Sequence, residues 1–163
     1  MQKIILIAGP TGSGKSEIAL RLAKKINGEI INADSMQVYK EIKILSARPE
    51  SYSNISHYLY GNISVKNNFS AGEWLKKVKL NLNKIINKKK QPIFVGGTGL
   101  YFKLLTEGIS NIPKIPDSIR IKARKLNANL GNDKFYSLLI KLDPLVQNKI
   151  KKNDTHRLIR AYE

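Results

Sequence analysis

The segment Gly9–Ser16 reads GPTGSGKS and matches the phosphate-binding pattern G-x-x-x-x-G-K-[ST]. An apolar run at residues 3–8 precedes it and predicts a buried strand. Residues 15–26 follow with apolar positions at helical spacing. The strand, loop and helix that the pattern requires are therefore present. They predict an α/β fold of the P-loop NTPase type, in which a parallel sheet is flanked by helices.

The loop has a direct physical use as a site for phosphate groups. We expect its glycines to adopt positive φ, so that the backbone amides and the positive end of the following helix face an anion. Lys15 adds a full positive charge, and the Ser16 hydroxyl is placed to ligate Mg²⁺. The predicted diphosphate- or nucleotide-binding set is Gly9, Pro10, Thr11, Gly12, Ser13, Gly14, Lys15 and Ser16. The motif leaves the reaction open, because kinases, NTPases and some transferases hold diphosphates in this way.

The composition sets limits on the class of protein. A chain of 163 residues with 42% hydrophobic residues is long enough for a domain with a real core. It has no cysteine, which excludes disulfides, cysteine-based zinc sites and thiol nucleophiles. No apolar run reaches the roughly 20 residues needed to span a membrane. Residues 1–8 lead directly into the phosphate loop, so we expect no signal peptide and a cytosolic protein.

The net charge points to a polyanionic partner. There are 29 Lys and Arg residues against 12 Asp and Glu residues, a formal net charge of +17. A field of this sign favours nucleic acid. Compositional drift is the alternative, because Lys, Asn and Ile are frequent throughout the chain. Arginines are few, and a guanidinium is not replaced by Lys where a two-pronged phosphate contact is needed.

Asp34 is the first acidic candidate for chemistry. The segment GEIINA at 28–33 predicts the second strand, and Asp34 follows its carboxyl end. Ligands of parallel α/β sheets bind at this edge, so Asp34 should lie near the phosphate loop. A carboxylate there serves as a metal ligand or a general base. The alternative is a capping or turn residue. In the preceding helix, we expect Ile18, Leu22 and Ile26 to face the core.

The middle of the chain contributes another strand and another glycine-rich turn. Residues 34–48 predict a short helix or loop, and residues 50–68 predict a loop with a short strand near 58–63. His57 in this loop is either catalytic or a surface or packing residue. A helix over 69–87, capped by Ser70, ends in the basic run Lys88–Lys90, which is either a solvated end that suits the helix dipole or a nucleic-acid contact.

Residues 91–95 predict a strand that opens into Gly96, Gly97, Thr98 and Gly99, and residues 100–107 predict a helix. The three glycines indicate a close backbone approach, with a tight turn that holds no ligand as the alternative.

The C-terminal part of the sequence is helical. A connector at 108–116 leads to predicted helices at 117–130, capped by Asp117, and 132–142, capped by Asn132 or Asp133. A short helix at 143–152 and another that begins at Asn153 or Asp154 follow. The expected domains are the α/β core (1–113), a helical insertion (114–152) and the start of a helix that returns to the core (153–163).

Several blocks, taken in order, resemble the bacterial tRNA dimethylallyltransferases, also called tRNA isopentenyltransferases. ADSMQVY and NDTxRLIRA are more specific signals than the phosphate loop. The blocks are GPTGSGKS (9–16), GEIINADSMQVY (28–39), VGGTGLYF (95–102), IPKIPDSIR (112–120) and KNDTHRLIRAYE (152–163). Members of this family are about twice as long, so the resemblance implies that the chain is either a fragment or a truncated gene product.

The resemblance implies an activity and a site. It implies Mg²⁺-dependent transfer of a dimethylallyl group from dimethylallyl diphosphate to N6 of the adenosine next to the anticodon of tRNA, by a monomer whose helical insertion binds the tRNA. Asp34 is then the general base, with Lys15 and Thr98 beside it as catalytic residues. The implied tRNA-binding residues are Asp34, Ser35, Met36, Gln37, Thr98, Arg120, His156, Arg157, Leu158, Ile159 and Arg160.

Three other hypotheses remain open. A small-molecule P-loop kinase shares the loop and the fold but requires a lid with paired arginines, which the sequence does not display. A transferase that prenylates free adenine nucleotides needs neither the basic charge nor the NDTHRLIRA block. A catalytically incomplete chain binds only RNA, or binds nothing.

Overall fold

The computed structural model describes residues 3–49, 54–109 and 115–163. The chain divides into two compact units, Met1–Ser110 and Asn111–Glu163. The first unit contains the sheet, and the second is helical. Residues 110–114, which include part of the predicted connector and of the IPKIPDSIR block, lie outside the described residues.

The first unit is built on a parallel sheet of four strands. Its strands are β1 (Ile5–Ala8), β2 (Gly28–Asn32), β3 (His57–Tyr58) and β4 (Gln91–Gly96), in the order β1-β4-β2-β3. The register pairs Ala8 with Gly96 and Asn32 with Val95, so three strands end at one edge of the sheet. The predicted parallel α/β fold is confirmed, and the strand expected near 58–63 is shorter and begins at His57.

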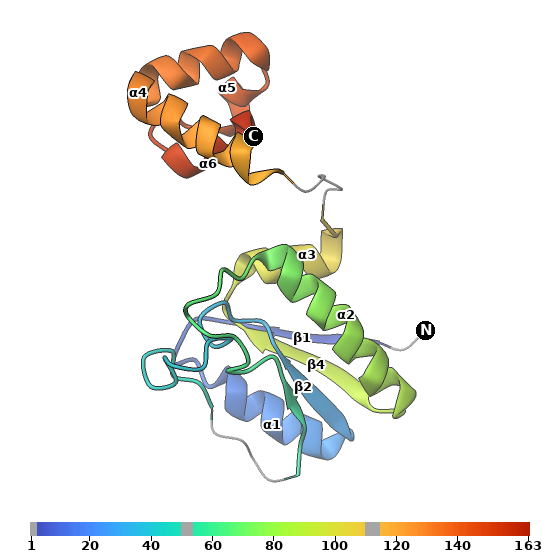
Figure 1. Cartoon of the computed structure of the whole chain (residues 1–163). Helices are drawn as coiled ribbons and strands as arrows, with labels where there is room; N and C mark the ends of the chain where they lie inside the picture. The colour runs from blue at the N-terminus through green and yellow to red at the C-terminus, as the bar shows by residue number, and fades with distance from the viewer. Residues whose placement is uncertain (1–2, 50–53, 110–114) are drawn as a thin grey trace. The chain divides into compact units, whose positions relative to one another are not determined.

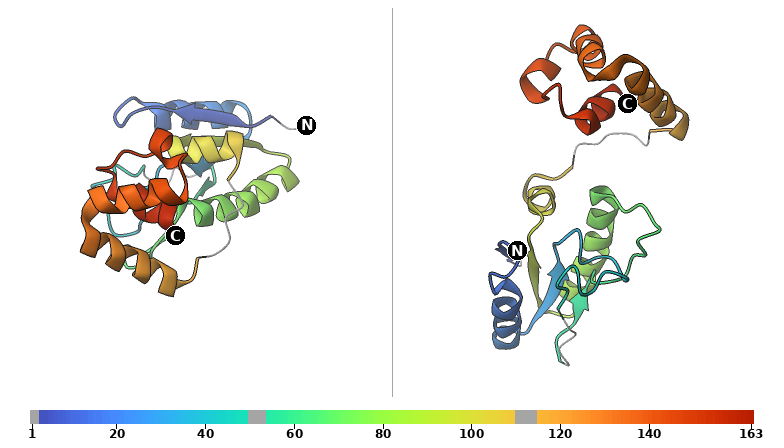
Figure 2. Two further views of the ribbon diagram at one scale, coloured as in Figure 1. Left: turned by 90° about the horizontal axis from the view of Figure 1, so that it is seen from above. Right: turned by 90° about the vertical axis from the view of Figure 1, so that its left-hand side faces the viewer.

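Helices cover both faces of the sheet (Figures 1 and 2). The helix α1 (Lys15–Lys25) lies on one face, while α2 (Ala71–Asn87) and α3 (Gly99–Glu107) lie on the other. Because side chains alternate along a strand, Ile30 and Ile93 face α1 whereas Ile31 and Phe94 face α2 and α3. The α2 side contains the larger core, in which Trp74 stacks on Tyr101 with ring centroids 3.9 Å apart.

The helix α1 buries small residues rather than the predicted isoleucine. Ala19 and Ala23 pack on the sheet, whereas Ile18 is 56% exposed, so the prediction that Ile18 faces the core is wrong. The physical reason is close packing against β2. A Cβ at Gly28 would lie 3.2 Å from the Cα of Ala23, so the helix backbone lies too near the strand for a large residue.

The other predicted elements of this unit are largely present. Ser70 caps α2 in a capping box with Glu73, which confirms the predicted helix start. Residues 35–47 form turns rather than a helix. Arg48 holds these turns together, because its Nη1 donates to the carbonyl oxygen of Tyr39 at 2.7 Å.

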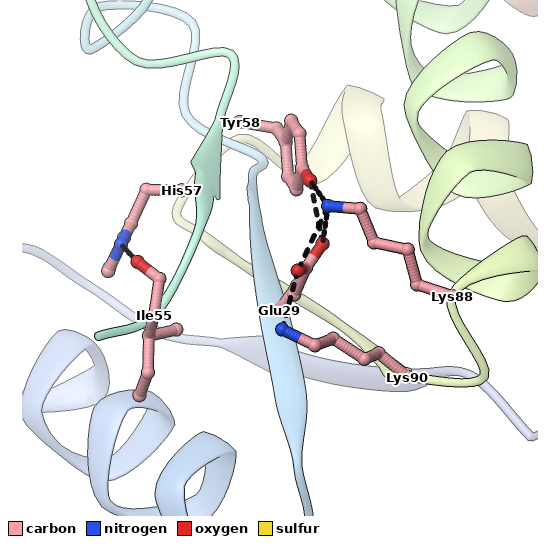
Figure 3. Close-up of polar contacts among 6 residues, drawn as sticks. All are labelled: Glu29, Ile55, His57, Tyr58, Lys88 and Lys90. Carbon is pink, nitrogen blue, oxygen red and sulfur yellow. Dashed lines mark hydrogen bonds and ion pairs between the residues drawn. The ribbon is translucent and has the colours of Figure 1, made fainter.

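A buried carboxylate at the beginning of β2 binds residues of β3 and of the turn between α2 and β4 (Figure 3). Glu29 is fully buried and accepts hydrogen bonds from Tyr58 Oη at 2.6 Å and Lys90 Nζ at 2.9 Å, and Lys88 Nζ lies 3.2 Å away. Two lysines of the run 88–90 are therefore bound to Glu29, rather than only forming a solvated helix end. Burial raises the pKa of Glu29, but the hydrogen bonds from Tyr58, Lys90 and Lys88 outweigh it and lower the pKa below its ordinary value.

The second unit packs three helices around a small core. They are α4 (Asp117–Leu142), α5 (Val146–Lys149) and α6 (Thr155–Tyr162), and their core contains Phe135, Leu139, Val146 and Leu158. Gly131 has φ 71° and divides α4, in agreement with the two helices that the sequence predicts there. The predicted cap at Asp117 is wrong, because Pro116 occupies the N-cap position and Asp117 is the first helical residue.

Asp154 caps α6, as predicted, by accepting from the backbone N–H of Arg157 at 3.1 Å. Residues 153–163, which were expected to lead back to the core, form this helix, and it packs on α4. Within residues 3–49, 54–109 and 115–163, the structure has no helix long and apolar enough to cross a membrane.

We predict that Glu29→Gln lowers the free energy of unfolding by about 2 kcal/mol at neutral pH, because it removes the charge that Lys88 and Lys90 bind. The native pKa of Glu29 is lowered, so its stabilisation is present above its ordinary value of 4.5 and is lost as the pH falls below it. Urea unfolding of both proteins across this range measures the difference. A difference that stays constant down to acid pH would contradict the assignment.

Candidate active site

The carboxyl ends of β1, β4 and β2 meet at one edge of the sheet. β4 lies between its neighbours and is tied to both of them beyond the regular strand pairs. The Gly9 N–H donates to the carbonyl oxygen of Gly96 at 3.3 Å, and the Thr98 N–H donates to the carbonyl oxygen of Ala33 at 3.2 Å. The phosphate loop, the glycine-rich turn and Asp34 therefore lie side by side, as the sequence predicts.

Two of the three glycines in the turn are required by close approach. A Cβ at Gly96 would lie 2.0 Å from the carbonyl oxygen of Ala33. A Cβ at Gly97 would lie 3.2 Å from the carbonyl oxygen of Gly9 and 3.6 Å from Oδ2 of Asp34. Gly99 has no atom within 4 Å of such a Cβ, so the close approach predicted there is wrong.

The phosphate loop has the conformation of an anion-binding turn. Gly12 and Gly14 have φ values of 80° and 76°, where glycine is favoured, and Gly14 is the N-cap of α1. Gly9 does not have the positive φ that the sequence predicts. A Cβ at this position would lie 2.9 Å from Ser13 Oγ, so the glycine leaves room for that side chain. The free amides of the first turn of α1, at the positive end of the helix dipole, therefore lie at the phosphate loop.

The side chains of the loop are held by one carbonyl group. Pro10 accepts from Ser13 Oγ at 2.8 Å and from Lys15 Nζ at 2.9 Å through its carbonyl oxygen. The Lys15 side chain therefore folds back over the phosphate loop, and its positive charge adds to the partial positive charge of the loop amides. This arrangement places a positive charge beside the positive end of α1, which suits a ligand with two or more negative charges.

Asp34 presents its two carboxylate oxygens differently. Oδ1 accepts from the backbone N–H of Met36 at 2.9 Å and of Gln37 at 3.4 Å, so this oxygen stabilises the turn. Oδ2 faces Gly97 and accepts no hydrogen bond from the residues that the structure describes. Asp34 is therefore a turn residue through one oxygen, which is one of the alternatives raised by the sequence, and a role of the other oxygen as base or metal ligand stays a prediction.

The negative charge of Asp34 contributes to the raised pKa values of two tyrosines. Burial and the negative charge of Asp34 raise the pKa of Tyr60. Burial, with smaller contributions from Tyr39 and Asp34, raises the pKa of Tyr101 to about 12. Both hydroxyl groups are therefore neutral at physiological pH, and a carboxylate at position 34 lies close enough to influence them.

Thr98 connects the glycine-rich turn to the segment after Asp34. Its Oγ1 accepts from the backbone N–H of Ser35 at 2.8 Å and donates to Ser35 Oγ at 3.2 Å. Gln37 is buried, and its Nε2 donates to the carbonyl oxygen of Ser46 at 3.0 Å, so this end of its side chain holds the following turn. Met36 is 54% exposed.

The described residues contain no group of three or more His, Asp or Glu side chains that could hold a metal ion. A cation at this edge would therefore depend on ligand phosphates and water in addition to protein atoms. The Ser16 hydroxyl, in the first turn of α1, is the predicted protein ligand. Mg²⁺ suits such a donor set, because it keeps several waters and is commonly bound through substrate phosphates.

His57 lies outside this group of residues. Its Nδ1 lies 2.8 Å from the carbonyl oxygen of Ile55, and its ring packs edge-on against Tyr60. Figure 3 shows His57 and Tyr58 on opposite sides of β3. The structure gives His57 a packing role, which is one of the two alternatives for this residue.

The predicted tRNA-binding residues of the second unit are mostly exposed. Arg120, His156, Arg157 and Arg160 have exposed side chains. Leu158 is 0% exposed and belongs to the core of the unit, so its side chain packs inside the unit, and its assignment as a tRNA-binding residue stays a prediction. The helical spacing of α6 turns this side chain toward α4. Ile159 is partly buried against the same core.

Comparison with known proteins agrees with this arrangement. The family model "IPP transferase" matches residues 37–163. The chain belongs to the IPP transferase family.

Relatives of this family align with the whole of this chain. A tRNA dimethylallyltransferase of Pelagibacter ubique is 55% identical, with 99% of this chain and 52% of the relative covered. One from Ehrlichia chaffeensis is 44% identical, with 100% and 54% covered. The chain thus spans about half the length of the curated relatives it matches.

Solved structures of this family share the fold. A eukaryotic dimethylallyltransferase that acts on tRNA is 31% identical with a TM-score of 0.84, over 98% of this chain and 40% of that chain. A tRNA isopentenylpyrophosphate transferase from Bacillus halodurans is 29% identical with a TM-score of 0.66, over 100% and 55%.

We predict that Gly96→Ala lowers the free energy of unfolding by about 3 kcal/mol or more, because backbone atoms of Ala33 cannot move away from the new methyl group. Gly99→Ala is the matched control. It meets open space and adds a methyl group in a helix, so it should change stability by less than about 1 kcal/mol, in the stabilising direction. Thermal and urea unfolding measure both. Equal effects would show that the close approach is not required.

Proposed function

We propose that this protein transfers a dimethylallyl group from dimethylallyl diphosphate to N6 of the adenosine next to the anticodon of tRNA, with Mg²⁺. In this reaction the bond between the allylic carbon and the diphosphate oxygen breaks, and a bond between that carbon and N6 forms. Diphosphate leaves with the electron pair, and N6 loses a proton. The observation that carries the proposal is that the phosphate loop and the Asp34 carboxylate both lie next to Gly97, where a Cβ would be 3.2 Å from the Gly9 carbonyl oxygen and 3.6 Å from Asp34 Oδ2.

The phosphate loop is the proposed site for the diphosphate. Negative charge develops on this leaving group as the allylic bond breaks, and fixed amides and a lysine stabilise it without reorganisation. Gly12 and Gly14 shape the turn, Lys15 supplies the full charge, and Ser16 would hold Mg²⁺. When bound, Mg²⁺ neutralises part of the charge on the diphosphate.

Asp34 is the proposed general base. An exocyclic adenine amine is a weak nucleophile and must lose a proton during attack, so a positioned carboxylate lowers the barrier. Oδ1 is bound to the turn and Oδ2 faces the phosphate loop, so we assign the proton transfer to Oδ2. Thr98 holds the backbone after Asp34 in place through Ser35, beside the proposed acceptor.

The proposed tRNA contacts lie in both units. Met36 is exposed next to Asp34, and Arg120, His156, Arg157 and Arg160 are exposed in the second unit. The net charge of +17 favours a polyanionic acceptor over a free nucleoside. An adenine stacked in the anticodon loop is inaccessible, so it must turn out to reach Asp34.

The deciding experiment is a transfer assay with labelled dimethylallyl diphosphate, Mg²⁺ and an anticodon stem-loop with consecutive adenosines. Label on the RNA supports the proposal. Label on free adenosine monophosphate but not on RNA would favour prenylation of nucleotides. RNA binding without label would identify a chain that only binds RNA, and transfer of phosphate from ATP to a small molecule would favour the kinase.

We predict that Asp34→Asn lowers the transfer rate by roughly 10²- to 10⁴-fold, because the amide cannot accept the proton. The Asn oxygen still accepts from Met36, so the affinity for dimethylallyl diphosphate should change by less than about twofold. Rapid-quench transfer and calorimetric binding measure the two quantities. Loss of diphosphate affinity together with activity would instead assign Asp34 to metal binding.

Lys15→Ala should instead weaken the binding of dimethylallyl diphosphate. Loss of a charge-assisted contact weakens diphosphate binding by about 10- to 100-fold. The same calorimetric titration tests this expectation, with Lys103→Ala, an exposed lysine of α3 paired with Glu107, as the control. Unchanged affinity in Lys15→Ala would place the diphosphate elsewhere.

A further inference from the structure

Asn32 is a polar residue at a position where an apolar one is expected. It ends β2 inside the sheet and is fully buried, next to Ile30 and Ile31. Buried strands of parallel sheets are normally apolar, because a polar side chain must recover the hydrogen bonds that it loses from water. Sequence analysis did not identify this residue, since a single Asn inside a strand carries no motif.

The side-chain amide of Asn32 forms hydrogen bonds with both the backbone N–H and the backbone carbonyl group of Asp34. Its Oδ1 accepts from the Asp34 N–H at 2.9 Å, and its Nδ2 donates to the Asp34 carbonyl oxygen at 2.9 Å. The second hydrogen of Nδ2 goes to the carbonyl oxygen of Leu59 at 3.0 Å. Both ends of the amide are therefore used, and two of its three bonds fix the residue that carries the proposed base.

The position of Asn32 is itself anchored. Its backbone carbonyl oxygen accepts from the indole Nε1 of Trp74 at 3.0 Å, and Trp74 is fully buried and stacked on Tyr101. Asn32 is therefore connected to α2 through Trp74 and to α3 through Tyr101. Leu59, the third partner, is held at φ 64°, a conformation that is costly for a leucine, and it precedes Tyr60, which experiences the charge of Asp34.

We propose that Asn32 is a positioning residue for the Asp34 carboxylate, and that its amide holds the Asp34 backbone so that Oδ2 faces the phosphate loop. The inference rests on the proposed role of Asp34 as the base. A proton acceptor loses most of its value when displaced by about 1 Å, since the rate depends on alignment with the reacting amine. An amide that bonds N–H and carbonyl of the same residue restricts this displacement more directly than packing does.

Two substitutions and a matched control test the proposal in the full chain. Asn32→Leu has a similar size and removes all three hydrogen bonds. Asn32→Ser keeps one donor and one acceptor. Ile31→Val alters the neighbouring, equally buried position of β2 without touching a polar contact of Asp34.

The kinetic readout separates positioning from general damage. Asn32→Leu should lower kcat for dimethylallyl transfer by on the order of 10-fold or more, with the affinity for dimethylallyl diphosphate within about twofold of the wild type. Asn32→Ser should recover part of the loss, and Ile31→Val should match the wild type. Equal kcat in Asn32→Leu and Ile31→Val, or parallel loss of diphosphate affinity, would overturn the proposal.

An activity-independent readout keeps the two proposals distinct. The Met36 N–H donates to Asp34 Oδ1, so its amide NMR shift should follow the ionisation of that carboxylate during a pH titration. We expect this response in the wild type and Ile31→Val, and its loss in Asn32→Leu. If the wild type transfers no label, the proposed function fails while this titration still decides the role of Asn32. An unchanged Met36 response in Asn32→Leu would overturn the positioning role.

If Asn32→Leu does not fold, Asn32→Ser replaces it in both measurements. A serine hydroxyl is too short to bond both the N–H and the carbonyl group of Asp34, so an intermediate loss of kcat and of the Met36 response is expected. A wild-type value of both quantities in Asn32→Ser would overturn the proposal in that case.

Discussion

The contact between the backbone of Gly96 and that of Ala33 organises the first unit. A Cβ at position 96 would lie 2.0 Å from the Ala33 carbonyl oxygen, so only glycine lets β4 end this close to the chain leaving β2. Because β4 lies between β1 and β2, this approach places Gly97 between the phosphate loop and Asp34, and Thr98 within hydrogen-bonding distance of Ser35. The candidate site is a consequence of that backbone packing.

The strand β2 carries one acidic residue near its beginning and another just beyond its end, and their surroundings give them opposite roles. Glu29 is fully buried and neutralised by Tyr58, Lys88 and Lys90, which lower its pKa and leave it no capacity for chemistry. Asp34 has one oxygen bound to the turn and the other directed toward Gly97. Position relative to the edge of the sheet, rather than residue type, separates the structural carboxylate of Glu29 from the one proposed as the base.

Local signals were predicted well. The phosphate loop, the cap at Ser70, the cap at Asp154 and the division of α4 at Gly131 all depend on a few adjacent residues, and all are present. The cap predicted at Asp117 is a local error, and the burial of a side chain is harder to predict because it depends on what covers the residue. Ile18 is exposed because α1 packs through alanines, and Leu158 is buried because α6 packs on α4. Neither partner is visible along the chain.

The α/β class, the phosphate loop and the family can be predicted from the sequence, because they depend on spacing and on short blocks of residues. The packed structure is needed to see which oxygen of Asp34 is bound to the turn, why position 96 requires glycine while position 99 does not, and that Glu29 and Asn32 are buried and hydrogen-bonded. These properties depend on atoms from segments far apart in the chain, such as Asn32 Nδ2 and the Leu59 carbonyl oxygen, which lie 3.0 Å apart in a hydrogen bond. Burial and hydrogen-bond partners are set when those strands pack together.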